Sequence, residues 1–351
     1  MTEEITWKSL LTKLVNRQTL NYEENSWWIN ALMNGQAPEA ATGAVMALQM
    51  QSGLTIDEIT AAVDAMLKHA EKLDIDAETT DIVGTGGDGA ATVNLSTMAS
   101  IAAAAAGVKI VKHGNRAASS KSGAADCLEQ LGLPLELSPE NAAKVFNEVG
   151  ITFAFAKTFH PAMRFVAPVR KALGIPTVFN ILGPLTNPAG PKHVAVGSAD
   201  RKLSPLMAQV YASRGQTGFV FTSCSGLDEM VADGPVTVWD FADGNVKEVR
   251  FDPAAELSIP QAKIEDIRGD TPEYNAKVLR DFVNGENVPS RSTALLNAAA
   301  AIAADGKLAG SAEKSLSERF ANAYRIAQET VDSGKAAKLL DDWITVAKKY
   351  A

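Results

Sequence analysis

The chain has 351 residues, 46% of them hydrophobic, and this length predicts two domains rather than one. Its net charge of −8 at pH 7 lacks the basic excess of nucleic-acid-binding proteins, so we expect no nucleic-acid partner. The two cysteines, Cys127 and Cys224, have no CxxC spacing and predict neither a zinc site nor a disulfide framework. The acidic start MTEEITWKSL and the lack of a long apolar run predict a cytoplasmic protein without membrane contact.

Residues 1–77 are predicted to form a small helical domain. Apolar residues recur at helical spacing in ITWKSLLTKLV, and Asn21 precedes a second helix as its N-cap, with Glu24 at the capping-box position. Thr55 and Glu58 repeat that pattern before AAVDAMLKHA. The stretches SLLTKLV and SWWINALM carry more large apolar residues than so small a domain can bury, which predicts a homodimer through these helices.

Residues 78–351 are predicted to form a larger α/β domain. Helical segments alternate with short strand candidates, namely TDIV, VKIVKHG, ITFAFA, HVAVGSA, TGFVFTS and GPVTVWDF. This alternation favours a mostly parallel central sheet covered by helices. The segment NILGPLTNPAG predicts a bend between the domains, and part of residues 172–192 is expected to join the helical domain in space.

A glycine-rich loop, GTGGDG at residues 84–89, follows the first predicted strand. Glycines let backbone N–H groups approach phosphate oxygens, and the start of the next helix adds partial positive charge. Asn94, Ser96 and Thr97 at that start could donate to a ligand or only cap the helix, but a cap does not require four glycines in six positions. The loop matches the letters of the dinucleotide-binding pattern GxGxxG. Asp88 inside the loop and the lack of a ribose-binding acid after it count against dinucleotide binding.

Three later stretches carry further candidate site residues. VKHGNRAASSKSG follows the second strand and is dense in phosphate or sugar donors. Asp228 and Glu229, in SGLDE, are either exposed charges or Mg²⁺ ligands beside phosphates. His160 precedes a helix in which Arg170 stands among apolar residues, and a buried guanidinium there needs an acid of the protein or a ligand carboxylate as partner.

These stretches together are similar to the anthranilate phosphoribosyltransferases. GTGGD, NLST, KHGNRAASSKSG, FHPAM, PVRKALG, FNILGPLTNPA and SGLDE stand in that family's order and spacing, over about residues 5–345. The family joins anthranilate to the ribose of 5-phosphoribosyl 1-diphosphate and releases pyrophosphate, a step of tryptophan biosynthesis. The resemblance implies a helical and an α/β domain, a homodimer through the helical domain, and two Mg²⁺ ions per subunit.

The resemblance also implies three sets of site residues and no general acid or base. The set for phosphoribosyl diphosphate is Gly84, Thr85, Gly86, Gly87, Asp88, Thr92, Asn94, Ser96, Thr97, Lys112, Ser119 and Ser120. The set for anthranilate is Gly84, His113, Asn115, His160, Arg170 and Pro184. The set for Mg²⁺ is Ser96, Asp228 and Glu229. An aromatic amine is already neutral at pH 7 and diphosphate leaves readily once neutralised, so orientation and electrostatics suffice.

Two other functions are compatible with parts of this pattern. A pyrimidine nucleoside phosphorylase of related fold would use phosphate and a nucleoside, with a differently ordered glycine loop. A relative that has lost catalysis and binds nucleic acid would have a basic surface and eroded motifs, whereas here the charge is −8 and the loops are intact. Lys157 and Phe159, beside His160, differ from many family members and could alter the range of aromatic acids accepted.

Overall fold

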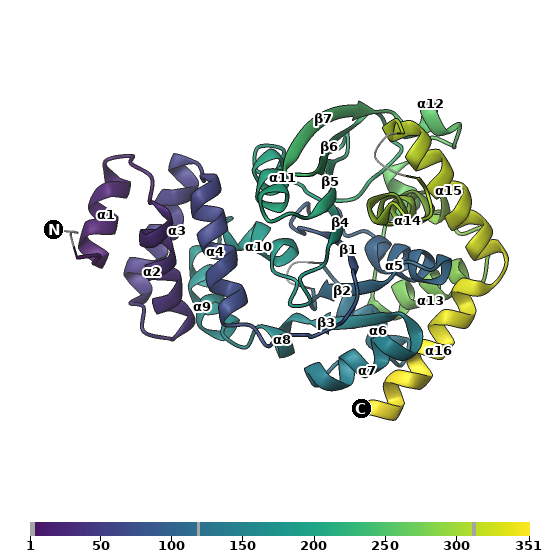
Figure 1. The fold of residues 1–351 in the computed structure, drawn as a ribbon, viewed down its shortest axis with the longest axis horizontal. Coiled ribbons are helices and arrows are strands. Elements are labelled where there is room, and N and C mark those ends of the chain that lie inside the picture. Colours follow the sequence, from purple (N-terminus) through teal and green to yellow (C-terminus); the bar gives the residue numbers. More distant parts are fainter. Residues whose placement is uncertain (1–3, 118–119, 311–313) are drawn as a thin grey trace.

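The computed structural model describes residues 4–117, 120–310 and 314–351, and it confirms the predicted fold class. An α-helical bundle lies to one side of a larger α/β body (Figure 1). The first four helices of the bundle are α1 Trp7–Val15, α2 Tyr22–Met33, α3 Glu39–Ser52 and α4 Ile56–Lys68. Both predicted capping boxes are present, with Asn21 and Thr55 accepting from the backbone N–H groups of Glu24 and Glu58.

Two later helices, α9 (Met163–Leu173) and α10 (Phe179–Leu185), return to this bundle. Helix α9 packs on α2 and α3, and α10 packs on α4. The segment NILGPLTNPAG therefore differs from the predicted bend, because its first half belongs to α10. Pro184 is tolerated in that helix since the helix ends one residue later and only one backbone hydrogen bond is forgone.

The α/β body is built on a sheet of seven strands in the order β3-β2-β1-β4-β5-β6-β7. Strands β3 to β5 in that order are parallel, and β6 and β7 form an antiparallel edge. The strands are β1 Thr80–Gly84, β2 Ile110–Gly114, β3 Ile151–Phe155, β4 His193–Gly197, β5 Thr217–Thr222, β6 Val236–Ala242 and β7 Asn245–Phe251. The sequence prediction missed β7, whose charged residues are mostly exposed, although Asp243-Gly244 before it is a recognised hairpin turn.

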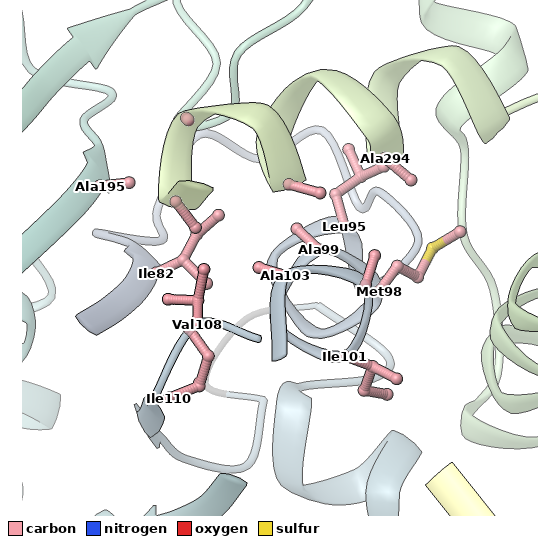
Figure 2. Close-up of a cluster of buried hydrophobic side chains, with 14 of the residues drawn as sticks. Ile82, Leu95, Met98, Ala99, Ile101, Ala103, Val108, Ile110, Ala195 and Ala294 are labelled. Carbon is pink, nitrogen blue, oxygen red and sulfur yellow. The ribbon is translucent and has the colours of Figure 1, made fainter. Parts of the chain in front are cut away.

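Helices cover the sheet on both faces. The helices of the α/β body are α5 Leu95–Ala106, α6 Ala124–Gln130, α7 Pro139–Val149, α8 Ala156–Phe159, α11 Ser204–Ser213, α12 Pro253–Leu257, α13 Pro272–Val283, α14 Arg291–Asp305, α15 Leu316–Asp332 and α16 Lys335–Tyr350, with a 3₁₀ turn at Ile264–Ile267. Helix α5 packs closely on α14 because both present small alanines, and its Leu95, Ala99 and Ala103 lie in the cluster that also contains Ile82 of β1 (Figure 2). The buried start of α5 is thereby fixed against the end of β1, where the glycine loop begins. No helix among the described residues is long and apolar enough to cross a membrane.

Candidate active site

A cleft of about 930 Å³ opens at the carboxyl ends of β1 and β2, with residues of α9 and α10 on its opposite wall. The strand order reverses at β1, because β2 and β3 lie on one side of it and β4 and β5 lie on the other. Ligands of open α/β sheets collect at such a switch point. The cleft thus combines the loops of the α/β body with a wall supplied by the helical bundle.

The glycine loop on one wall is tied to the acidic pair behind it. The backbone N–H of Gly86 donates to Oδ2 of Asp228 at 2.6 Å. Gly86, Gly87 and Gly89 have φ of 71°, 85° and 72°, which favours glycine. A Cβ on Gly84 would collide with the Asp228 carboxylate, so the close approach of loop and acid requires a glycine there.

Asp228 and Glu229 are buried beside each other, and they could hold a cation. Burial and the charge of Asp88 raise the pKa of Asp228 to about 7. Burial and the charge of Asp228 raise the pKa of Glu229 well above its usual range. One oxygen of Asp88 is also buried without a hydrogen-bond partner among the described residues. A divalent cation would relieve this repulsion, and oxygen donors suit Mg²⁺, so the donor set fits that ion.

This acid pair does not form a complete metal cage. The described part of the chain contains no group of three or more His, Cys, Asp or Glu side chains placed to hold a metal ion. Mg²⁺ commonly keeps one or two carboxylates and takes its other ligands from substrate phosphates and water. The arrangement is compatible with an ion that arrives together with a phosphorylated ligand.

Lys112 supplies a buried positive charge next to the start of α5. Its side chain is 1% exposed, and its Nζ donates to the carbonyl of Ile82 at 2.9 Å and to Oγ of Ser96 at 3.0 Å. Burial lowers the pKa of Lys112, whereas the charges of Asp81 and Glu229 raise it. A cation fixed beside a helix N-terminus forms an anion site, because the amine and the helix dipole act in the same sense.

Two histidines stand together deeper in the cleft, with ring centroids 5.0 Å apart. Nδ1 of His113 lies 3.0 Å from the carbonyl of Gly183, and Nε2 of His160 lies 2.9 Å from that of Thr186. A carbonyl only accepts, so these nitrogens carry the protons. Burial lowers the pKa of His113 to about 3 and that of His160 to about 4, so both rings are neutral at pH 7. Nε2 of His113 is left as a buried acceptor with no partner among the described residues.

Arg170 projects from α9 on the opposite wall. Its guanidinium is half-buried and donates to Oδ1 of Asn180 at 3.2 Å. Burial lowers the pKa of Arg170, but a guanidinium remains charged in water at any ordinary pH. It forms no ion pair with any described residue, so the alternative of a salt bridge within the protein is not seen there. Its charge is available to an anionic ligand.

Nearly all the residues predicted from the sequence line this one cleft. Thr97 does not, because its hydroxyl is buried beneath the start of α5, with no hydrogen-bond partner in the described part of the chain. Ser119 lies outside the described residues. Lys157 lines the cleft and pairs with Glu136 at 2.6 Å. The sequence interpretation missed Arg164 and Asn180, which also line it. Asn180 stands in the recognised motif FNILGPLTNPA and Arg164 directly follows FHPAM, but only the packing of α9 and α10 shows which way they face.

Comparisons with known proteins agree with this geometry. Models of the glycosyl transferase family match residues 8–70, as its helical bundle domain, and residues 76–337, as its a/b domain. The anthranilate phosphoribosyltransferase of Arthrobacter sp. (strain FB24) is 47% identical, over 98% of this chain and 96% of that protein. The one from Thermobifida fusca (strain YX) is 45% identical, over 99% of this chain and 99% of that protein.

Solved structures show the same likeness. The crystal structure of anthranilate phosphoribosyltransferase from Thermus thermophilus has a TM-score of 0.88 and 36% identity, covering 97% of this chain and 99% of that one. The enzyme of Saccharomyces cerevisiae in complex with PRPP and Mg has a TM-score of 0.88 and 27% identity, covering 99% of each chain. This chain therefore belongs to the anthranilate phosphoribosyltransferase family.

Proposed function

We propose that this chain transfers the phosphoribosyl group of 5-phosphoribosyl 1-diphosphate to the amine of anthranilate, in tryptophan biosynthesis. The products are N-(5-phosphoribosyl)anthranilate and pyrophosphate. The observation that carries the proposal is the pairing of two different anion sites in one cleft. A glycine loop with buried Lys112 suits phosphates, and Arg170, without an ion pair to any described residue, suits a carboxylate on the facing wall.

The glycine-loop wall would bind the phosphoribosyl donor. The N–H groups of the loop and the cation of Lys112 would neutralise phosphate oxygens, and Asn94, Ser96 and Thr92 line the same wall with polar side chains. Ser120 also lines the cleft, on the loop after β2. The backbone N–H of Thr97 already donates to the carbonyl of Asn94 at 3.0 Å and its hydroxyl is buried, so Thr97 would act only through the dipole at the start of α5.

Asp228 and Glu229 would hold Mg²⁺, with Ser96 as a neighbouring ligand. The mutual repulsion of the two buried acids and the hydroxyl of Ser96 beside Lys112 support this assignment. The yeast relative was solved with PRPP and Mg. Two ions per subunit is the number that we propose from the family resemblance. When bound, the ion neutralises the diphosphate and makes it a better leaving group.

The α9–α10 wall would bind anthranilate. Arg170 can hold a carboxylate through two parallel hydrogen bonds, and Asn180 fixes the direction of its guanidinium. The free Nε2 of His113 can accept a hydrogen bond from the aromatic amine and so aim the nitrogen lone pair. Pro184 lies on this wall, and Asn115, directly after β2, would contact the ring from the α/β body.

The reaction then needs orientation more than proton transfer. The bond between C1 of the ribose and the diphosphate oxygen breaks, and the amine nitrogen forms the new bond to C1, which passes through a state with oxocarbenium character. The amine gives up one proton to solvent or to the departing pyrophosphate. The neutral histidines keep positive charge away from the amine, and the N–H groups of the loop stabilise the charge that develops on the diphosphate.

The test is direct. Purified protein with anthranilate, 5-phosphoribosyl 1-diphosphate and Mg²⁺ should consume anthranilate, followed by the loss of its fluorescence. A pyrimidine nucleoside with inorganic phosphate is the matched control. Turnover of the control without loss of anthranilate would assign the chain to nucleoside phosphorolysis and reject the proposal.

We propose further that the chain is a homodimer through its helical bundle. The support is apolar surface on that bundle, where Trp7 and Trp27 pack edge to face at 5.2 Å while Val15 is 68% exposed and Ile175 is 48% exposed. Large exposed apolar groups gathered on one small domain are typical of an interface.

A further inference from the structure

Asn275 lies outside the cleft but is hydrogen-bonded to a residue that lines it. It is the fourth residue of α13 and is 1% exposed. Its Nδ2 donates to Oδ1 of Asn94 at 3.0 Å, across 181 residues of sequence. Asn94 itself is half-buried in the cleft wall. A buried amide that does not line the cleft thus contacts a side chain that the proposed function places at the phosphates.

The direction of this contact is fixed by backbone groups that cannot reverse. Oδ1 of Asn275 accepts from the backbone N–H of Asp270 at 2.9 Å. An N–H only donates, so the oxygen of Asn275 faces Asp270 and its NH₂ group faces Asn94. Asn94 must therefore turn its own oxygen toward Asn275. On its other side, Nδ2 of Asn94 donates to the carbonyl of Ser122 at 3.3 Å, which demands the same orientation.

The segment that carries this network is attached directly to the exit of the glycine loop. The backbone N–H of Gly269 donates to the carbonyl of Ala91 at 2.8 Å, and that of Val93 donates to the carbonyl of Ile267 at 2.9 Å. A Cβ on Gly269 would meet the carbonyl of Thr92, so the two backbones touch. The orientation of the Asn94 amide is thus set by a rigid frame and not by solvent.

The side chain of Asn94 also does not cap α5, although Asn94 occupies the N-cap position. It is the N-cap of α5, where an asparagine ordinarily accepts from a backbone N–H of the first turn, yet its side chain makes no such hydrogen bond. Its oxygen instead accepts from Asn275 and from Oγ of Ser122, and its NH₂ group donates one proton to the carbonyl of Ser122 and has one left for the cleft. An amide free to flip would present its oxygen to a phosphate and repel it.

We propose that Asn275 is a positioning residue for the phosphoribosyl donor, holding the Asn94 amide with its remaining N–H toward the donor's phosphate. This inference rests on the proposed function, in which Asn94 binds that donor. Asn275 touches no reacting atom. Its effect is therefore expected in the KM for the donor, with little effect on the KM for anthranilate.

The experiment replaces the hydrogen-bond-donating NH₂ group of Asn275 with an accepting oxygen in a side chain of the same shape. Asn275→Asp keeps the bond to the Asp270 N–H but places an acceptor oxygen against Oδ1 of Asn94, so the two oxygens repel and displace the Asn94 amide from the orientation that Ser122 also supports. We expect KM for 5-phosphoribosyl 1-diphosphate to rise about tenfold, the loss of one charge-assisted hydrogen bond, and KM for anthranilate to stay within about twofold. The matched control is Asn141→Asp on α7, where the same charge change removes a donor to the carbonyl of Tyr350 far from the cleft.

A double-mutant cycle separates orientation from the repulsion of a new carboxylate. In an Asn94→Ala background, Asn275→Asp should leave the donor KM unchanged, because there is no amide left to orient. A rise of equal size in both backgrounds, or a joint rise of both substrate KM values, would overturn the inference. If Asn275→Asp does not fold, Asn275→Ala enters the same cycle, with a smaller rise in the KM for the phosphoribosyl donor expected because the two contacts to Ser122 remain. Turnover by the unmodified enzyme tests the proposed function separately, since that measurement involves no variant.

Discussion

Asp228 accepts a hydrogen bond from the backbone N–H of Gly86 at 2.6 Å, although 142 residues separate them. Through this bond the acidic turn after β5 and the glycine loop after β1 form one structural unit. The space between them has no room for a side chain at Gly84. Any change that separates the glycine loop from the acidic turn should therefore weaken the binding of the phosphoribosyl donor and of the cation together.

Gly84→Ala should separate them. The added methyl group collides with the Asp228 carboxylate, and strain of about 1–3 kcal/mol is typical of such overpacking. We expect kcat/KM for the donor to fall about ten- to hundredfold and the Mg²⁺ requirement to rise. Gly43→Ala in α3 is the control, because Gly43 has no positive φ and an added Cβ would meet its nearest atom only at 3.5 Å. An unchanged Mg²⁺ titration in Gly84→Ala would show that the close approach is irrelevant to the cation.

Asp228→Asn combined with Glu229→Gln should need far more Mg²⁺ for turnover. Amides bind Mg²⁺ less well than carboxylates, so we expect the half-saturating concentration to rise on the order of tenfold or more. Asp243→Asn, an exposed change in the β6–β7 turn, is the comparison. The same titration curve in the double variant and the unmodified protein would leave the pair as a charged turn only.

Arg170→Ala and Lys112→Ala should have opposite effects on the two substrates. Removing Arg170 takes away a charge-assisted contact of about 1.5–3 kcal/mol, on the order of ten- to a hundredfold in kcat/KM for anthranilate. Removing Lys112 should instead weaken the donor. Both KM values measured in both variants check the assignment. Equal weakening of both substrates in Arg170→Ala would contradict a role at the carboxylate.

His160 should make the protein less stable as the pH falls below neutrality. Its pKa is about 4 when folded, against about 6.5 for a free imidazole, so between these values the unfolded chain binds the proton. Its stabilising effect is complete above about pH 6.5 and is lost as the pH falls toward 4. The free energy of unfolding is measured with denaturant at pH 7 and at pH 5. Between these two pH values it should fall by on the order of 2 kcal/mol less in His160→Asn than in the unmodified protein.

Asp81 does not disturb this comparison. Burial raises its pKa to about 6, which has the opposite sign, but it is present in both proteins and cancels in the difference. If the free energy of unfolding falls equally in His160→Asn and in the unmodified protein, the imidazole binds its proton as readily in the folded chain as in the unfolded chain, which contradicts the prediction.

The helical bundle should bring two chains together. Light scattering at micromolar concentration should give about twice the mass of one chain of 37.1 kDa. Val15→Glu with Ile175→Glu places charges on the exposed apolar surface of the bundle and should reduce the measured mass. A mass near that of one chain for the unmodified protein would refute the proposed assembly.

Features set by neighbouring residues could be predicted from the sequence. The capping boxes at Asn21 and Thr55 depend on a side chain three residues away, and both are present in the structure. The glycine loop, Lys112 and Arg170 were found because their residue types are unusual in their local setting. Strand β7 was missed because NVKEVRF is charged and mostly exposed, so its pairing with β6 and not its own composition makes it a strand.

Features set across the fold could not be predicted. Asn275 is an ordinary polar residue in the first turn of α13 until the structure places it against Asn94. The neutrality of His113 and His160 depends on burial, which outweighs two carbonyls of the α10 region that raise their pKa, and no local pattern reveals it. Thr97 shows the converse, because a residue in a recognised motif points into the core and not into the cleft.

The return of α9 and α10 to the helical bundle has a consequence for the order in which the protein can fold during synthesis. Val166, Val169 and Leu182 belong to the same apolar core as Trp28 and Val63 of the first helices. A ribosome releases the first four helices long before these residues exist. The N-terminal bundle must therefore wait, incompletely packed, until residue 185 has emerged, by which time the first three strands are already available to pair.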